Sequence, residues 1–324
     1  MPRPSIDPVV WQPPVVPARA RQRGSVVPLP PLRLLEVVGT GPEDVLVDEA
    51  GNVLTGVADG RVLRLSPDGR HIDVVADTGG RPLGLEWLPD GSLLVCDARR
   101  GLHAVDVGTG EVETLVSGLA FCNNAAVAPD GTVYFSDSTD RLGIDHWQGE
   151  LLQHSGTGRL LRRGLSAETV VLLEGLQFAN GVALAPDGTS VVVAETGAYR
   201  LTRWSLTEGT QDVLVDNLPG FPDNISIGSD GLIWVAMGSP RDPSLDRMLA
   251  MPPALRKAVW RLPSRLLPSA QRTVWVQAYG LDGELVHDFQ GPHDRLRFVT
   301  GVREVDGRVY LGSLIGSWVA YFDL

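Results

Sequence analysis

The stretch NNAAVAPDGTVYFSD, residues 123–137, joins two short apolar runs through a small polar turn that ends in Gly131. Asp130 and Gly131 are residue types that accept the positive φ angles of a tight turn, and Val, Tyr and Phe in the flanks favour extended backbone. The stretch therefore predicts a β-hairpin.

Five further stretches repeat this pattern, and a second pair of strand-like runs, such as residues 60–77, follows most of them. The repeats occupy residues 43–56, 83–97, 180–195, 223–238 and 299–313. The first three turn glycines, Gly51, Gly91 and Gly131, are spaced by about 40 residues. Four strands in each such unit, repeated six times, predict an all-β fold, a six-bladed β-propeller with four-stranded blades.

The two ends of the chain indicate how the ring closes. After Gly307 only one further strand remains, so the last blade lacks a strand that residues 32–38 could supply. Such a closure would leave no open sheet edge. Residues 1–31 contain nine of the 24 prolines and are predicted to form an extended arm, so that residues 32–324 form the single propeller domain.

Two insertions interrupt the repeat, at residues 138–157 and 238–272. The second has helical apolar spacing broken by prolines, which predicts short helices. Both insertions leave the second strand of a blade, and these loops emerge on one face of a propeller. They are either surface loops without a role in function or a lid over a site. We prefer the lid, because long structured loops are often functional.

Composition excludes several classes of protein. With 28 Lys and Arg against 39 Asp and Glu, the net charge is −11, which argues against a nucleic-acid partner. No run is long and apolar enough for a membrane span, and the N-terminus has no signal-peptide core. Cys96 and Cys122 are too few for a disulfide framework, so we expect buried free thiols and a cytoplasmic location. We expect a small-molecule substrate and no membrane partner.

The repeats place polar residues at equivalent positions. The innermost strand of each blade is predicted to start eight residues before the turn glycine. A propeller brings the first residues of these strands together around its central channel. The six residues are Glu43, Leu83, Asn123, Asn180, Asp223 and Val299, and the next positions include Asn224 and Thr300. For any one of them the simpler interpretation is a hydrogen bond to a strand end or to water in the channel.

The set as a whole indicates a metal site. Two carboxylates and several amide oxygens suit Ca²⁺, which takes 6–8 oxygen ligands. Without a cation, Glu43 and Asp223 would repel each other. The lack of His and Cys favours Ca²⁺ over Zn²⁺, with Mg²⁺ or Mn²⁺ as alternatives. The four oxygen donors of this register, Glu43, Asn123, Asn180 and Asp223, are the predicted ligands.

These residues and several motifs resemble the superfamily of gluconolactonase (SMP-30), strictosidine synthase-like and paraoxonase-type propellers. The motifs include CNNAAVAPDG, QFANGVALAPDG, PGFPDNISI and REVDGRVYLGSL, and the resemblance extends from about Gly39 to the C-terminus. It is strongest to the strictosidine synthase-like branch. In the hydrolytic members Ca²⁺ is held by Glu, Asn, Asn and Asp, sometimes with a further Asn. The resemblance places these ligands at Glu43, Asn123, Asn180, Asp223 and Asn224.

The chain also departs from that superfamily. Leu83 stands where paraoxonase-type enzymes carry a His, and Thr300 where strictosidine synthase carries its catalytic Glu. Phe121 stands where the gluconolactonase branch carries an Arg. These departures argue against His-based activation of water, against condensation of an amine with an aldehyde, and against a sugar-acid lactone.

The resulting hypothesis is a Ca²⁺-dependent hydrolase that opens a lactone or cleaves an ester. Asp223 is the first choice of general base, with His146, His154 and Glu195 as second choices. The predicted pocket favours an apolar substrate and is lined by Leu83, Phe121, Phe178, Phe221, Val299 and Thr300. The alternatives are a non-catalytic scaffold with a structural ion, and an unconventional synthase or isomerase. The motifs of serine hydrolases, zinc proteases and Walker-type nucleotide sites are missing.

Overall fold

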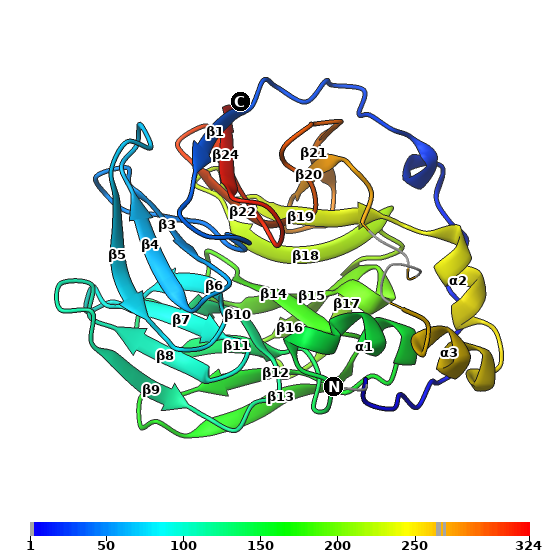
Figure 1. Ribbon diagram of the computed structural model, residues 1–324. Helices are drawn as coiled ribbons and strands as arrows, with labels where there is room; N and C mark the ends of the chain where they lie inside the picture. Colours follow the sequence, from blue (N-terminus) through cyan, green and yellow to red (C-terminus); the bar gives the residue numbers. More distant parts are fainter. Residues whose placement is uncertain (1–2, 264–266, 268–269) are drawn as a thin grey trace.

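The computed structural model describes residues 3–263, 267 and 270–324, and it confirms the six-bladed propeller. Six four-stranded antiparallel sheets surround a central channel (Figure 1). Blade 1 contains β2 (Leu46–Val47), β3 (Val53–Gly56), β4 (Arg61–Leu65) and β5 (Ile72–Asp77). Blade 2 contains β6 (Pro82–Trp87), β7 (Leu93–Asp97), β8 (Gly101–Val105) and β9 (Val112–Val116). Blade 3 contains β10 (Cys122–Val127), β11 (Val133–Asp137), β12 (Gly158–Arg163) and β13 (Thr169–Leu176).

The remaining three blades follow the same order from the channel outward. Blade 4 contains β14 (Ala179–Leu184), β15 (Ser190–Glu195), β16 (Arg200–Ser205) and β17 (Gln211–Val215). Blade 5 contains β18 (Gly220–Ile227), β19 (Ile233–Pro240), β20 (Val274–Tyr279) and β21 (Leu285–Gly291). Blade 6 contains β22 (Val299–Val305), β23 (Arg308–Ser313), β24 (Trp318–Asp323) and, outermost, β1 (Arg33–Glu36).

Strand β1 closes the ring as predicted. It pairs antiparallel with β24, from Arg33 opposite Tyr321 to Glu36 opposite Trp318, so the last blade combines both ends of the chain. Figure 1 shows β1 and β24 next to each other, and β1 is the outermost strand of this blade. The closure protects an edge that would otherwise expose unpaired backbone groups.

The apolar core is divided among the six interfaces between neighbouring blades. Each interface has its own cluster of buried side chains; the one between blades 5 and 6 contains Trp234, Val276, Val302 and Leu311. The buried free thiols Cys96 and Cys122, as expected, belong to the cluster between blades 2 and 3. Alternate residues of each strand face one neighbouring blade or the other, because successive side chains point to opposite faces of a sheet.

The helical elements lie on one side of the propeller. The first insertion forms η2 (Ile144–His146) and α1 (Trp147–Gln153), and the second forms α2 (Pro243–Leu249) and α3 (Pro253–Trp260). Asp242 starts α2, because its side chain accepts hydrogen bonds from the backbone N–H groups of Ser244 and Leu245. Two single turns, η1 (Ala18–Arg21) and η3 (Thr196–Ala198), complete the described helices. No described helix is long and apolar enough to cross a membrane.

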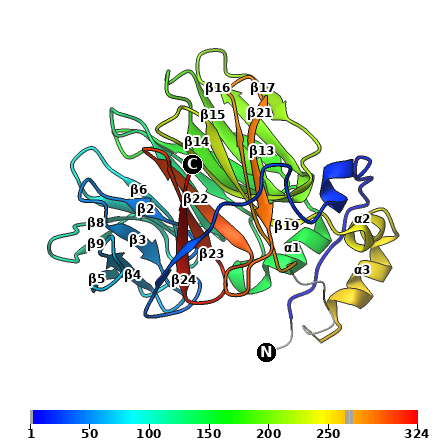
Figure 2. The ribbon, with the colours of Figure 1, turned by 90° about the horizontal axis from the view of Figure 1, so that it is seen from above.

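The N-terminal arm runs alongside the helices before it reaches blade 6. Both ribbon views show the segment before β1 passing α2 and α3 and then crossing to the outer strands (Figures 1 and 2). Arg19 in η1 forms an ion pair with Asp288 of β21, and Pro28 forms a β-bridge with Gln290. The arm is therefore attached to the propeller at several points.

Candidate metal centre and pocket

A bulge at the start of the inner strands brings the predicted ligands into the channel. In β10 the pairing with β11 jumps between Cys122 and Ala125, so Asn123 and Asn124 stand outside the regular ladder. The same jump occurs in β14, around Asn180, and in β18, around Asp223 and Asn224. Bulges redirect side chains in this way at functional sites.

Three asparagines each leave their side-chain oxygen without a hydrogen-bond donor. Nδ2 of Asn123 donates to Ser138 Oγ at 2.9 Å, and Nδ2 of Asn180 donates to Asp223 Oδ1 at 2.9 Å and to Thr196 Oγ1 at 3.1 Å. Nδ2 of Asn224 donates to both oxygens of Glu43 at 3.1 Å. All three Oδ1 atoms are buried and unpartnered. A buried oxygen without a donor is costly, so each of these atoms fits a cation.

The two carboxylates are buried close to these amides. Burial, and then the negative charges of Asp223 and Asp44, raise the pKa of Glu43 well above its ordinary value. Burial raises the pKa of Asp223 to about 7. Arg81, whose Nη2 donates to Gly41 O at 2.8 Å, is a nearby positive charge that opposes the shift at Glu43. A divalent cation would offset the cost of burying these two negative charges.

The donor set fits Ca²⁺ better than a transition metal. It offers carboxylate oxygens from Glu43 and Asp223 and amide oxygens from Asn123, Asn180 and Asn224. The described residues contain no cluster of three or more His, Cys, Asp or Glu side chains that could hold a metal. Hard oxygen donors of mixed charge are what Ca²⁺ accepts, whereas Zn²⁺ favours His and Cys.

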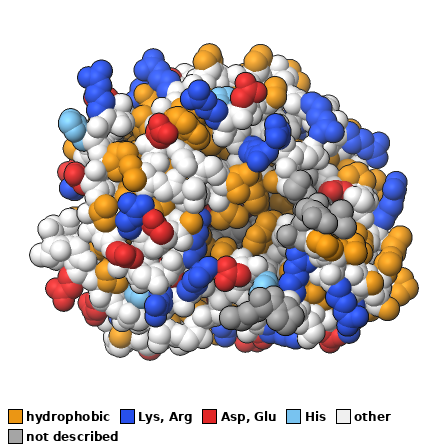
Figure 3. All heavy atoms as spheres, viewed as in Figure 1, with side chains coloured by type: hydrophobic (Ala, Val, Ile, Leu, Met, Phe, Trp, Pro, Cys, Tyr) orange, Lys and Arg blue, Asp and Glu red, His pale blue; other side chains and the backbone are white. Residues whose placement is uncertain are grey.

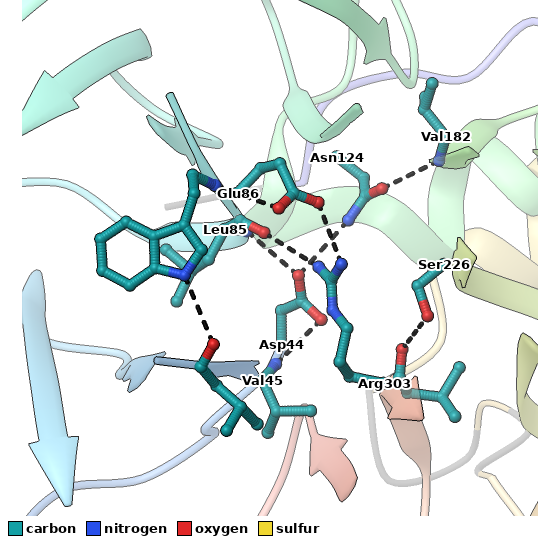
Figure 4. Close-up of polar contacts among 11 residues, drawn as sticks. Asp44, Val45, Leu85, Glu86, Asn124, Val182, Ser226 and Arg303 are labelled. Atoms are coloured by element: carbon teal, nitrogen blue, oxygen red, sulfur yellow. Dashed lines mark hydrogen bonds and ion pairs between the residues drawn. The ribbon is translucent and has the colours of Figure 1, made fainter. Parts of the chain in front are cut away.

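A second polar layer in the channel is linked by hydrogen bonds and an ion pair (Figure 4). Asp44 accepts hydrogen bonds from the backbone N–H of Val45 at 2.9 Å and of Leu85 at 3.0 Å. Burial raises the pKa of Asp44 to about 6, against the opposing charge of Arg303. Arg303 forms an ion pair with Glu86 at 3.0 Å.

Asn124 belongs to this paired layer. Its Oδ1 accepts from Val182 N at 2.8 Å, and its Nδ2 lies 3.5 Å from Asp44 Oδ2. Asn124 therefore ties blade 3 to blades 1 and 4, and its oxygen is not free for a cation. The equivalent residue in blade 5, Asn224, turns its amide toward Glu43 instead.

The predicted register is wrong by one residue in blade 6. The hairpin of β22 and β23 pairs Val305 with Arg308 across two turn residues, whereas β10 and β11 pair Val127 with Val133 across five. Counting back from Gly307 therefore overshoots the channel position. Thr300 is the residue equivalent to Asn123, and its Oγ1 donates to Glu43 O at 2.8 Å. Val299 does not line the cavity but packs in the core between blades 5 and 6.

An apolar cavity of about 130 Å³ opens above the predicted ligands. In Figure 3 apolar side chains gather around a hollow near the centre of this face. Five of the six predicted pocket residues line it, namely Leu83, Phe121, Phe178, Phe221 and Thr300. The floor includes Glu43, Asn123, Asn180 and Asp223, and helices α1 and α2 add Trp147, Leu151 and Leu245 to the walls. The insertions therefore form part of the pocket.

Both candidate histidines lie away from the cavity lining. His146 packs edge-on against Trp260, at 6.2 Å between ring centres. His154 ends α1, is buried, and stacks on Trp11 of the arm at 4.2 Å. Burial lowers the pKa of His154 to about 4, followed by the charges of Arg256 and Arg200. Neither side chain contacts the predicted metal ligands. Neither histidine is therefore placed to act as a general base at this site.

Glu195 is also not a base candidate. It is buried at the end of β15 and forms an ion pair with Arg200 at 2.6 Å, and it accepts a hydrogen bond from Thr202 Oγ1. These contacts tie β15 to β16. Asp223 is thus the one sequence-predicted base that lines the cavity.

The sequence interpretation missed several pocket residues. Phe298 of the loop before β22 lines the cavity and occupies the position equivalent to Phe121, Phe178 and Phe221. The one-residue shift in blade 6 hid this fourth phenylalanine. Trp147 of the first insertion also lines the cavity, and its ring centre lies 5.7 Å from that of Phe298. This approach depends on how α1 folds back, which the sequence repeat does not predict.

With this geometry in hand, the comparisons with known proteins identify the family. A family model of strictosidine synthase matches residues 123–209, and a model of the strictosidine synthase-like N-terminal region matches residues 31–65. Adipocyte plasma membrane-associated protein of Salmo salar is 36% identical over 325 residues, covering 90% of this chain and 77% of the relative. The chain belongs to the strictosidine synthase-like family.

Other relatives agree with this assignment. Strictosidine synthase-like 4 of Arabidopsis thaliana is 31% identical over 310 residues, covering 89% of this chain and 82% of the relative. Among solved structures, a gluconolactonase of Xanthomonas campestris superposes with a TM-score of 0.65 at 19% identity, covering 99% of both chains. A regucalcin of Agrobacterium tumefaciens, described as a calcium-binding protein, gives 0.62 at 14% identity, covering 89% of this chain and 94% of that one. These structural neighbours show the fold that this member of the strictosidine synthase-like family shares.

Proposed function

We propose that this protein is a divalent-cation-dependent hydrolase, with Ca²⁺ as the cation, that opens a lactone or cleaves an ester of low polarity. The observation that carries the proposal is the group of three unpartnered amide oxygens beside two buried carboxylates. All of these residues except Asn224 line the floor of an apolar cavity. The names of two structural neighbours, a gluconolactonase and a calcium-binding regucalcin, agree with it.

In this proposal one group of residues binds the cation and another residue accepts a proton from water. Glu43, Asn123, Asn180, Asp223 and Asn224 would hold the cation, which when bound supplies a Lewis acid for a carbonyl oxygen. Asn180 orients Asp223 through the 2.9 Å hydrogen bond to Oδ1. Asp223 borders the cavity, where it can accept the proton of an attacking water.

The walls indicate the class of substrate. Leu83, the four equivalent phenylalanines and Trp147 surround the floor, so an alkyl or aryl group would be buried there with a gain from desolvation. Among the described residues that line the cavity, the charged ones are the acids Glu43, Asp223 and Asp242. These surroundings disfavour an anionic or strongly polar substrate, such as a polyhydroxylated sugar lactone, and favour a neutral apolar one.

Turnover of neutral alkyl lactones and phenyl esters, measured with Ca²⁺ and after chelation, tests the proposal. We expect turnover that needs Ca²⁺ and that falls by about 100-fold or more in Asp223→Asn, because a general base contributes at least that factor. Asp73→Asn, an exposed carboxylate on β5, is the matched control. Full turnover in Asp223→Asn would refute the assigned base. If no ester or lactone is hydrolysed and chelation only lowers the melting temperature, the protein is a metal-stabilised scaffold.

A further inference from the structure

The N-terminal arm makes backbone contacts with the helices that wall the pocket. The backbone N–H of Asp7 donates to Gln153 Oε1 at 2.8 Å, and that of Val9 donates to Gln153 O at 2.9 Å. Further along, the N–H of Trp11 donates to Leu249 O at 3.1 Å. The arm thus binds the last residue of α1 and the last residue of α2. Other residues of these two helices, including Trp147, Leu151 and Leu245, line the cavity.

Arg256 of α3 joins the arm to α1 from inside the protein. Its side chain is fully buried, and its Nη1 donates to Leu152 O at 3.0 Å while its Nη2 donates to Val9 O at 2.7 Å. No carboxylate among the described residues lies within ion-pair distance of it. A buried guanidinium held only by carbonyl groups depends on every one of them, because a lost partner leaves a buried N–H unsatisfied. Displacing the arm would therefore disturb Leu152 and α1.

The arm also completes the packing behind the pocket wall. Ile6 is 3% exposed and belongs to a cluster that includes Leu152 and Leu245, both of which line the cavity. Trp260 closes this cluster, and its Nε1 donates to Pro4 O at 2.7 Å. One side of Leu152 and Leu245 thus faces the substrate space while the arm supports the other.

We propose that residues 3–11 and Arg256 hold α1 in the place where Trp147 and Leu151 close the apolar cavity, so that the arm sets how tightly an apolar ligand is bound. Arg256 and Ile6 are positioning residues, since neither lines the cavity. The statement about substrates rests on the proposed hydrolase function. The statement about the pocket wall does not, because it concerns binding of any neutral apolar molecule.

Two single substitutions in the full-length chain test this inference. Arg256→Met keeps an unbranched apolar stem but removes the guanidinium and so both donors, and Ile6→Ala removes support without touching a polar group. Val15→Ala is the control, because Val15 is an arm residue that is 86% exposed. The measurements are binding of the neutral fluorescent probe N-phenyl-1-naphthylamine, hydrogen exchange of residues 147–153, and calorimetric Ca²⁺ binding.

We expect both variants to bind the probe about ten-fold more weakly and to exchange faster in α1, with Ca²⁺ affinity unchanged and Val15→Ala like the wild type. If esters are hydrolysed, KM rises by a similar factor while kcat changes little, because the lost binding is shared by ground state and transition state. Should Arg256→Met fail to fold, Ile6→Ala decides. Wild-type probe binding and exchange in a folded Ile6→Ala variant would overturn the inference, whether or not the protein is a hydrolase.

Discussion

The channel asparagines differ in their hydrogen bonds, although the three strands that carry them follow one sequence pattern. Asn123 and Asn180 use their N–H groups on Ser138, Thr196 and Asp223 and keep a free oxygen, while Asn124 uses both ends of its amide within the protein. The sequence could predict that these oxygens meet at the channel. It could not predict which were free, because the oxygen of Asn124 is occupied by the backbone N–H of Val182, in the neighbouring blade.

His154 makes the stability of the protein depend on pH. Its pKa is lowered to about 4 in the folded state, against 6.5 ordinarily, so the unfolded chain binds the proton more readily. The contribution is absent above pH 6.5 and destabilises the fold progressively as the pH falls toward 4. At pH 5 this linkage costs about 2 kcal/mol.

His154→Asn removes that titration and suits the left-handed backbone at this position, where φ is 53°. Urea unfolding at pH 7.5 and pH 5 measures the effect. We expect the wild type to lose about 2 kcal/mol more than the variant between these two pH values. Equal losses in the two proteins would show that His154 is protonated as easily in the folded state as in the unfolded chain.

At the scale of the element, neighbouring inner strands approach each other closely at alternating glycines. A Cβ on Gly181 of β14 would lie 2.2 Å from Ile225 N and 2.6 Å from the carbonyl carbon of Asn224, both in β18. Gly84 and Gly301 face Asn124 and Asp44 in the same way. Blades 2, 4 and 6 therefore carry glycine where blades 1, 3 and 5 carry the polar residue.

Gly181→Ala should push β14 and β18 apart, which separates Asn180 from Asp223. We expect a loss of about 1–3 kcal/mol in unfolding free energy, as for other overpacked cores. We also expect weaker Ca²⁺ binding by calorimetry. Gly24→Ala, whose Cβ would meet only an ordinary contact at 3.6 Å, serves as the control. Wild-type stability together with unaltered Ca²⁺ affinity would contradict the close approach.

The closing strand β1 offers a second test at this scale. Leu35 is 6% exposed and packs in the cluster between blades 6 and 1, whereas Glu36 beside it is exposed. Leu35→Ala is expected to lower the unfolding free energy by about 2–5 kcal/mol, and Glu36→Ala by less than about 0.5 kcal/mol. Denaturant unfolding of both variants measures this difference. Similar small effects would mean that β1 is not needed to close the ring.

For the whole molecule, the repeats were sufficient to predict blade number, ring closure and the channel position in five blades. They failed in blade 6, because a two-residue turn there shortens the hairpin and shifts Val299 into the core. The roles given to His146 and His154 failed for another reason. Insertions fold against each other and the arm, and their contacts have no repeat from which to be inferred.

The arm, the helices and the propeller meet at one cavity, and the paired layer of Asp44, Glu86 and Arg303 fills the channel beyond it. The proposed cation would stand between an apolar space and this hydrogen-bonded polar layer. It would also link five ligand residues from four blades. Its binding should therefore stabilise the whole ring, by about 2.7 kcal/mol at a free concentration of 100 times Kd.

Calorimetric titration of the chelator-treated protein with Ca²⁺, compared with Asn180→Ala, shows whether the channel residues hold a cation. We expect one Ca²⁺ per chain, with binding lost or greatly weakened in the variant, because it lacks one of the free oxygens and the orienting bond to Asp223. A wild-type protein that binds no Ca²⁺ at millimolar concentration would contradict the account, and so would an Asn180→Ala variant that binds it equally well.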